Sequence, residues 1–244
     1  MESNASIERA HRLLAEGMGR DHVEDPDDPS TVWAMQLALR IPKADPPARS
    51  DLIAAAARAV VEVCLDERYA EQLSRWYGHR IRKVARRARN KAWDDAQDVP
   101  GHTVEAAGAA ARAFVPATVS EVPKAVAKLQ VKGTDLETDE PGAVEGEDPV
   151  VVLDGGLGLS AGKAAAQAGH ASMLLCAAMP TDWVVDWAGR GLPLTAREVP
   201  HDVFARAAAL DEAVPVVDAG FTEVDPDTTT ALGLPAAGPL RGVS

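Results

Sequence analysis

The feature that most constrains this chain is an acidic stretch at residues 134–149, TDLETDEPGAVEGEDP, which separates two halves of similar pattern. All of its charges are negative, it contains glycine and proline, and it has no apolar periodicity, so we expect a linker. Each half begins with an apolar strand-like run, followed by an alanine-rich helical segment, a stretch with Trp and Gly, a short strand, another helix, and a turn with a strand. This repetition predicts an internal duplication.

The order of strands and helices in each half predicts α/β layers, with helices covering a sheet. The expected fold class is therefore α/β with two similar lobes. We expect four parts: a flexible acidic leader at 1–30, a first lobe at 31–133, the linker at 134–149 and a second lobe at 150–244.

The net charge of −12 is unevenly distributed along the chain. Residues 31–133 carry 17 basic and 11 acidic side chains, whereas residues 151–244 carry 5 and 11. A polyanionic partner would therefore meet the first half most favourably.

The two cysteines, Cys64 and Cys176, are too few for a disulfide framework. Each lies in an apolar segment, which predicts a buried small side chain. No Cys/His spacing suits a metal site. No apolar run is long enough to span a membrane, and the first residues do not have the pattern of a secretory signal, so we expect a cytoplasmic protein.

A glycine-rich turn follows the first apolar run of the second half, VVVLDGGLGLSAGK at residues 150–163. It does not fit the phosphate-binding loop of nucleotide hydrolases, because Leu157 stands where the first glycine is needed and Ala164 where the magnesium-binding hydroxyl is needed. Gly156, Gly158 and Ala161 formally fit a dinucleotide-binding pattern. That signal is weak, because no acidic residue ends a second strand about 20 residues later.

The helix that follows this turn presents a polar face. Ser160 is a good N-cap, which places Lys163 in the first turn, and Lys163, Gln167 and His170 share one face at i, i+4 and i+7. A cation at the positive end of a helix favours either a bound anion or a solvated lysine. The face is therefore either an anion site, with Ser160, Gln167 and His170 as substrate-binding residues, or a solvated edge with a locally hydrogen-bonded histidine.

Two blocks of the second half resemble the type-2 peptidyl-tRNA hydrolase family. The first comprises LSAGK, AAQ and GHA within residues 159–171, and the second is DAGFTEV at 218–224 followed by TALG at 230–233. Two spaced blocks in this order are far more specific than either alone. The resemblance covers roughly residues 149–239.

The resemblance implies an enzyme that cleaves the ester between peptide and tRNA with water and without a cofactor or metal ion. It also implies α/β/α lobes, each built on a mixed sheet of about four strands, in a family that usually pairs as homodimers. The family's implicated residues correspond here to Lys163, Asp218 and Thr222. Asp218 would orient or deprotonate water, Lys163 would stabilise the oxyanion or hold a terminal phosphate, and Thr222 would donate a hydrogen bond. The plainer interpretations are a turn-capping aspartate and an ordinary strand threonine.

The sequence departs from the family pattern at an upstream aspartate. Gly156 stands in that place and Asp154 is displaced toward the start of the chain. The family's last strand is also shortened here. These departures leave a second hypothesis open, a catalytically inactive RNA- or protein-binding relative, and a nucleotide-dependent enzyme is a third.

The first half reads as a degenerate copy of the second. Arg49 falls near the Lys163 position, Ile53 and Ala56 replace Gln167 and His170, and Val99 replaces Asp218. We therefore expect a single-chain pseudodimer with one inert and one active lobe, and a monomer is compatible with this arrangement.

The inert lobe carries a basic run, RIRKVARRARNK at residues 80–91, which predicts a strand and then a helix start. Its charges are candidates for contacting tRNA phosphates, and the substrate-binding prediction names Arg80, Arg82, Arg86 and Arg87. The alternative is a solvated basic face that pairs with the acidic leader and linker. The neighbouring Trp76 and Trp93 are expected in the core or between the lobes.

Overall fold

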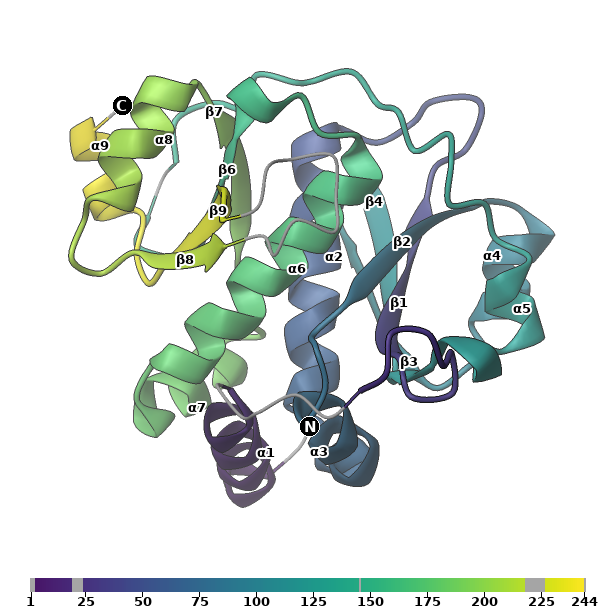
Figure 1. The fold of residues 1–244 in the computed structure, drawn as a ribbon. Coiled ribbons are helices and arrows are strands. Elements are labelled where there is room, and N and C mark those ends of the chain that lie inside the picture. The colour runs from purple at the N-terminus through teal and green to yellow at the C-terminus, as the bar shows by residue number, and fades with distance from the viewer. Residues whose placement is uncertain (1–2, 19–23, 145, 218–226, 244) are drawn as a thin grey trace.

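Two mixed β-sheets stand face to face with two long helices between them (Figure 1). The computed structural model describes residues 3–18, 24–144, 146–217 and 227–243. The outer faces of the sheets carry shorter helices, so the layers run helix, sheet, helix pair, sheet, helix. Three further helices close the bottom of the molecule as drawn in Figure 1. The α/β class with two similar lobes is as predicted.

The N lobe contains one five-stranded sheet and its helices. Its elements are β1 (Trp33–Arg40), α2 (Arg49–Cys64), η1 (Glu67–Tyr69), α3 (Ala70–Tyr77), β2 (Lys83–Ala88), α4 (Lys91–Ala96), β3 (Gly101–Ala106), β4 (Ala109–Phe114), β5 (Ala117–Thr118), η2 (Val119–Glu121) and α5 (Lys124–Ala127).

The C lobe repeats this order around a four-stranded sheet. Its elements are β6 (Val150–Asp154), η3 (Gly155–Leu157), α6 (Ala161–Ala178), α7 (Thr181–Gly189), β7 (Thr195–Val199), α8 (His201–Ala208), β8 (Val214–Val217), β9 (Thr229–Leu234) and α9 (Gly238–Val243).

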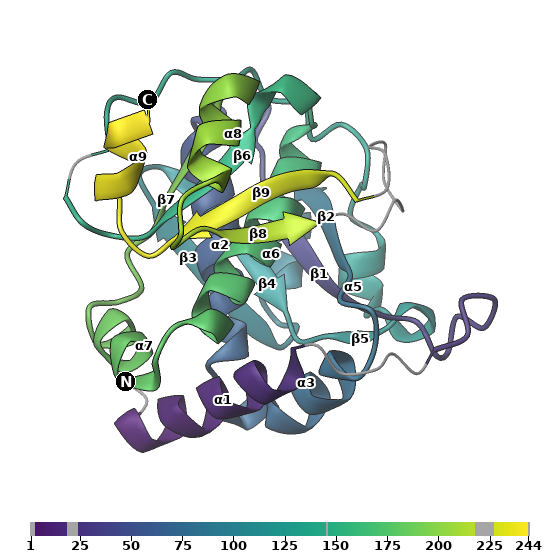
Figure 2. The same ribbon diagram turned by 60° about the vertical axis from the view of Figure 1, so that its left-hand side comes forward.

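The two sheets share one topology. The strand orders are β2-β1-β4-β3 and β7-β6-β9-β8, with one parallel pair at the same end of each sheet and antiparallel pairs elsewhere. The parallel pairs are each joined through two helices, as crossover connections require. In Figure 2, β8 and β9 run side by side across the C lobe. This correspondence supports the predicted duplication, which stays a hypothesis.

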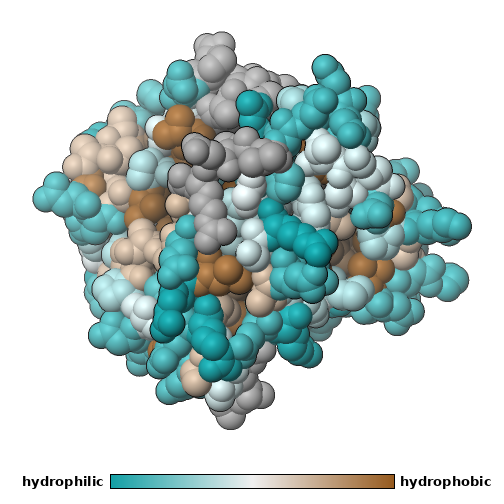
Figure 3. Space-filling model, turned by 60° about the horizontal axis from the view of Figure 1, so that its bottom comes forward, coloured by the Kyte–Doolittle hydropathy of each residue, from teal (hydrophilic) through white to brown (hydrophobic). Residues whose placement is uncertain are grey.

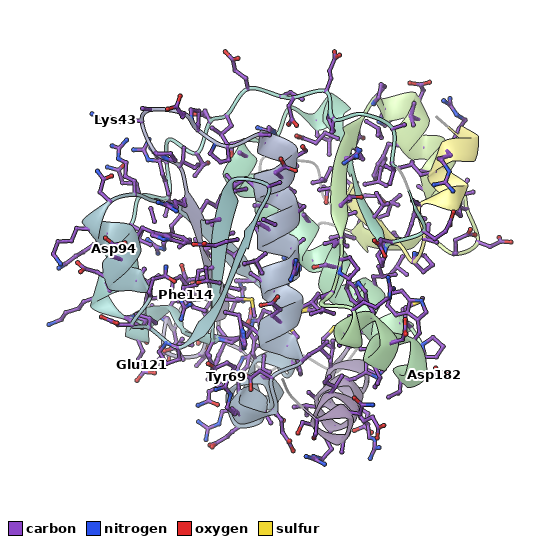
Figure 4. All side chains as sticks on the ribbon, turned by 180° about the vertical axis from the view of Figure 1, so that it is seen from behind. Lys43, Tyr69, Asp94, Phe114, Glu121 and Asp182 are labelled. Atoms are coloured by element: carbon purple, nitrogen blue, oxygen red, sulfur yellow. The ribbon has the colours of Figure 1, made fainter. Side chains whose placement is uncertain are left out.

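The middle helices α2 and α6 are packed on all sides. Both are rich in alanine, and they contact each other and both sheets: α2 covers β3, β4 and the other lobe's β7, while α6 covers β8, β9 and the other lobe's β2. Small side chains let each helix approach two sheets and a helix at once. Figure 4 shows α2 standing between the two sheets when the molecule is seen from behind. Each sheet therefore depends on both helices for its core.

The apolar core crosses the lobe boundary for the same reason. One cluster joins Leu37 and Leu39 of β1 to Met173 and Cys176 of α6, and a second joins Ile53 of α2 to Val151 of β6. Cys64 and Cys176 are both buried and free, as predicted from their apolar surroundings.

The leader is not flexible throughout, which corrects the sequence prediction. Residues Asn4–Gly17 form α1, capped by Ser3 and packed on α3 and α7. Its amphipathic spacing places Ile7, Ala10 and Leu14 in the core, and this apolar stripe outweighs the acidic composition on which the prediction relied. Trp76 and Trp93 are buried, as expected.

The linker contacts the starts of both middle helices. The Thr134 hydroxyl accepts a hydrogen bond from the Gly162 amide at 3.2 Å, and the Asp139 carboxylate accepts one from the Ser50 amide at 2.8 Å. No helix or strand is assigned within its described residues. The lobes are therefore tied together at the same end by their connection.

The outer surface is mostly polar on the side drawn in Figure 3, where hydrophobic residues form small separate patches. None of the helices in the described parts of the chain has the length and apolar character that a membrane crossing requires. The cytoplasmic location stays a prediction.

Candidate active site at the start of α6

The C-lobe sheet brings three chain segments to one edge. Strand β6 is parallel to β7 and antiparallel to β9, and β9 is antiparallel to β8, so β6, β7 and β8 all end at the same edge. The start of α6 follows β6 there, α8 follows β7, and β8 ends at Val217. Parallel strands present their carboxyl ends together, which is where α/β proteins commonly place their sites.

The start of α6 is capped by the chain itself. Ser160 has an extended backbone, and its hydroxyl accepts a hydrogen bond from the Lys163 amide at 3.3 Å, as the sequence predicted. The neighbouring Gly162 amide donates to Thr134, and the close approach leaves no room for a side chain at position 162. Because hydroxyls already occupy these two amides, an anion at this helix start would depend on the partly buried Lys163 side chain.

Gln167 lies one turn further along α6 and faces the C-lobe sheet. It is 8% exposed, and its side-chain oxygen accepts a hydrogen bond from the Thr230 hydroxyl at 2.9 Å. The pairing of β8 with β9 is irregular here, because Val216 pairs with Ala231 whereas Val217 pairs with Thr229. An extra residue of this kind re-aims a side chain next to a site. Thr230 was part of the resemblance, but its contact with Gln167 was not predicted.

The other two predicted catalytic residues, Asp218 and Thr222, lie outside the described residues. Asp218 follows the end of β8 directly in sequence. Their roles stay predictions.

His170 lies at the contact between the lobes, away from the sheet edge. Its Nδ1 is 3.2 Å from the Lys83 ammonium of β2, which also approaches the Met173 sulfur at 3.5 Å and the face of the Trp76 ring at 5.0 Å. His170 lies seven residue steps after Lys163, or about 10 Å along the helix axis. The structure therefore brings Ser160, Lys163 and Gln167 to the edge and places His170 against the other lobe.

Burial shifts the titration of this pair. It lowers the pKa of Lys83 to about 7, and burial together with the nearby ammonium lowers the pKa of His170 well below its ordinary value. Both shifts favour the neutral forms. A neutral amine and imidazole can share a hydrogen bond inside the protein, which fits a packing role between the lobes. Neither the histidine's lysine partner nor this contact was predicted, since no local pattern links β2 to α6.

The displaced aspartate has its own partners at the end of β6. Asp154 is 3% exposed and accepts hydrogen bonds from the Gly156 amide at 2.9 Å and from His201 Nδ1 at 2.6 Å. A side chain at position 156 would come within 3.1 Å of both residues. The glycine that departs from the family pattern therefore makes room for this aspartate–histidine pair, and His201 is a residue that the sequence analysis missed.

The start of α2, the corresponding place in the N lobe, is closed by ion pairs and hydrogen bonds. Arg49 is 5% exposed and binds the Glu198 carboxylate of β7 through two nitrogens, at 2.6 and 2.7 Å. It also donates to the backbone oxygens of Leu136 and Leu159. The Asp139 carboxylate binds the Ser50 amide and hydroxyl. This helix start is filled by the chain's own acidic groups.

The basic run folds as β2 and the start of α4, as predicted, but most of its candidate arginines are engaged within the protein. Arg80 and Arg82 pair with Glu24 of the leader, and the ion pair with Arg82 lowers the pKa of that carboxyl. Arg86 donates to the Gln36 side chain at 2.8 Å and to a backbone oxygen. The leader-pairing interpretation thus holds for the first two. Arg87 donates to the neutral Gln130 side chain.

Within the described part of the chain, no three His, Cys, Asp or Glu side chains gather as a metal site would require. The polar groups at the edge are a lysine, an amide, a threonine and an aspartate–histidine pair. Such groups can position water and stabilise an oxyanion, which is the chemistry of ester hydrolysis.

Comparison with known proteins identifies the family to which this chain belongs. A profile of the family described as peptidyl-tRNA hydrolase PTH2 matches residues 149–239, which are the C lobe. A peptidyl-tRNA hydrolase of Pyrobaculum aerophilum is 38% identical over 94 residues, which cover 34% of this chain and 78% of that relative. The chain therefore belongs to the PTH2 family.

Proposed function

We propose that the C lobe hydrolyses the ester bond of peptidyl-tRNA and that the N lobe is a degenerate partner lobe within the same chain. The observation that carries this proposal is the shared sheet edge: Lys163 lies in the first turn of α6, the helix that follows β6, and β8 ends at Val217, one residue before Asp218. Family membership and the activity named for the Pyrobaculum aerophilum relative support the substrate.

The proposed reaction uses water and the side chains of Lys163, Asp218 and Thr222. Water adds to the ester carbonyl, the bond from that carbon to the ribose oxygen breaks, and the ribose oxygen takes a proton, which yields a free peptide acid and tRNA. Lys163 stabilises the negative charge that develops on the carbonyl oxygen. Asp218 orients the attacking water or accepts its proton, and Thr222 donates a hydrogen bond to the reacting groups. The Gln167–Thr230 hydrogen bond fixes the wall of the site beside Lys163.

The N lobe lacks this lysine and this aspartate. Arg49 stands near the lysine position, at the first residue of α2, and is held by Glu198, and Val99 replaces the aspartate. Thr103, which aligns in sequence with Thr222 and keeps its residue type, is held between Gln97 and Arg112, at 2.7 Å from each. We infer that this lobe supplies the second sheet and helix that a homodimeric partner would otherwise provide. The chain would then act as a single-chain pseudodimer.

The test is hydrolysis of an N-acetyl-aminoacyl-tRNA by the purified full chain under single-turnover conditions. Lys163→Ala and Asp218→Asn should each lower the rate by about 100-fold or more. Lys124→Ala on α5 and Asp211→Asn, both exposed, are the matched controls and should keep the wild-type rate. Near-normal rates in both site variants would exclude the assignment. A wild-type protein that binds tRNA without hydrolysing its ester would instead be the catalytically inactive relative.

A further inference from the structure

A shallow hollow of about 470 Å³ opens beside the start of α6, and the N lobe lines it. Its walls are Arg87 of β2 and the segment Gln130 to Gly133 that leads into the linker, including Val131 and Lys132. The next residue, Thr134, binds the Gly162 amide. The last lining residue, Gly133, is therefore one residue along the chain from Thr134, which contacts the start of α6 that carries Lys163.

Strand register shows which residue of the C lobe corresponds to Arg87. Arg87 pairs with Leu39 of the central strand β1, one step before the last pair, and Glu198 pairs with Leu153 of β6 at the same step. Each strand lies on the edge of its sheet next to the other lobe's middle helix. Glu198 neutralises Arg49 at the start of α2. At the start of α6, the residue that corresponds to Glu198 is Arg87, which is a cation.

Two cations, Arg87 and Lys132, are among the residues that line the hollow. Among the residues that the structure describes, Arg87 makes its hydrogen bonds with Gln130, which is neutral, and neither Arg87 nor Lys132 forms an ion pair. Gly133 has a positive φ of 73°, and a side chain there would come within 3.0 Å of the Arg87 guanidinium. Val131 is 52% exposed and adds an apolar surface between the two cations.

We propose that Arg87 and Lys132 form a subsite for the RNA backbone, which binds phosphodiester groups of the strand whose ester lies at Lys163. This inference rests on the proposed function. Two cations beside an exposed aliphatic side chain suit a phosphate and its ribose, and a bidentate arginine is the side chain best matched to phosphate. The subsite belongs to the inert lobe and the reacting groups to the active lobe, so substrate binding would require both. Of the four arginines predicted from the basic run, Arg87 is the one assigned here.

The test measures binding of deacylated tRNA to the full chain at several KCl concentrations. The variant R87Q/K132Q should bind about tenfold more weakly near 0.1 M KCl. Its slope of log K against log [KCl] should be shallower by about 1.4, which corresponds to two lost contacts with single-stranded phosphates. The control R12Q/R75Q removes the same charge from exposed sites on α1 and α3 and should stay within twofold of wild type.

Two further results decide the proposal. Arg87→Lys should keep most of the affinity, and thermal melts should show that R87Q/K132Q is folded. Binding by R87Q/K132Q within twofold of the control, or no binding of tRNA by the wild type, overturns the subsite. Failure of the proposed function has a separate readout, because it would appear as absent ester hydrolysis by the wild type while the binding difference persists.

Discussion

The two middle helices begin in corresponding places, yet the chain treats the two starts differently. At α2, Arg49 is neutralised by Glu198 and the helix amide of Ser50 is bound by Asp139. At α6, the linker supplies the uncharged Thr134, and the position matching Glu198 holds Arg87. Among the described residues, the start of α2 is closed by internal anions, whereas the start of α6 has at its rim an arginine, Arg87, that forms no ion pair.

The two helix starts therefore offer different surroundings to an anion, which supports the proposal that the site lies in the C lobe. A helix start attracts anions wherever its amides and nearby cations are not satisfied. An acidic linker tethered beside both starts would compete with a polyanionic substrate at either one. The structure directs the Asp139 carboxylate to the start of α2 and the Thr134 hydroxyl to the start of α6, so one linker gives the two helices different caps.

The largest expected effect concerns the closed start. Arg49→Ala should lower the free energy of unfolding by about 3–5 kcal/mol, because it leaves the Glu198 carboxylate buried without a partner. Urea denaturation measures this loss. Arg75→Ala breaks an exposed pair on α3 and should cost no more than about 1 kcal/mol. The double variant Arg49→Met/Glu198→Leu should recover most of the stability. An Arg49→Ala variant as stable as Arg75→Ala would show that α2 is not closed by this pair.

Substitution at the start of α6 should have the opposite outcome, a small change in stability and a large change in activity. Lys163→Met should change the free energy of unfolding by no more than about 1 kcal/mol, since Lys163 is only partly buried and removing a cation from a helix start does not weaken the helix itself. Ester hydrolysis should nevertheless fall by about 100-fold, or about 2.7 kcal/mol of transition-state stabilisation. Unfolding and single-turnover hydrolysis are measured on the same preparation. A stability loss as large as that of Arg49→Ala would mean that the two starts are equivalent.

The contact between the lobes should make stability rise with pH. Lys83 has a pKa of about 7 when folded and 10.5 as an ordinary lysine, so between these values the unfolded chain binds the additional proton and alkali favours folding. The contribution is about 2 kcal/mol between pH 7 and 9. His170 acts in the same direction below its ordinary pKa of 6.5, because its folded pKa is lowered and stability is lost as the pH falls.

The variant Lys83→Met isolates this contribution. Its stability relative to wild type should be highest at pH 7 and should decline by about 2 kcal/mol by pH 9, measured by urea midpoints at constant ionic strength. Lys91→Met, at a lysine that is 86% exposed on α4, should show a constant difference over the same range. A constant difference for Lys83→Met as well would mean that its ammonium stays charged at the lobe contact.

The sequence was sufficient where the signal is local. The apolar run of β6, the Ser160 cap and the helical face of α6 follow from spacing, and the repeated order of elements predicted two α/β lobes. The sequence failed where partners come from the other lobe. Nothing near Arg49 indicates Glu198, 149 residues away, and nothing near His170 indicates Lys83. The basic run also forms a strand, in which successive side chains face opposite sides of the sheet, so only some of its arginines can reach a substrate.

The smallest effect tests whether the acidic linker is a structural part of the closed start. Ala48 precedes α2 and provides no side-chain cap, and Asp139 takes that role by binding the Ser50 amide. Asp139→Ala should therefore lower the free energy of unfolding by about 1 kcal/mol, the usual cost of losing a cap. Asp135→Ala removes the same charge from an exposed position of the same linker and should have almost no effect. Equal effects in urea denaturation would show that the linker acts through its overall charge. A loss confined to Asp139→Ala would show that one carboxylate of the linker closes the start of α2.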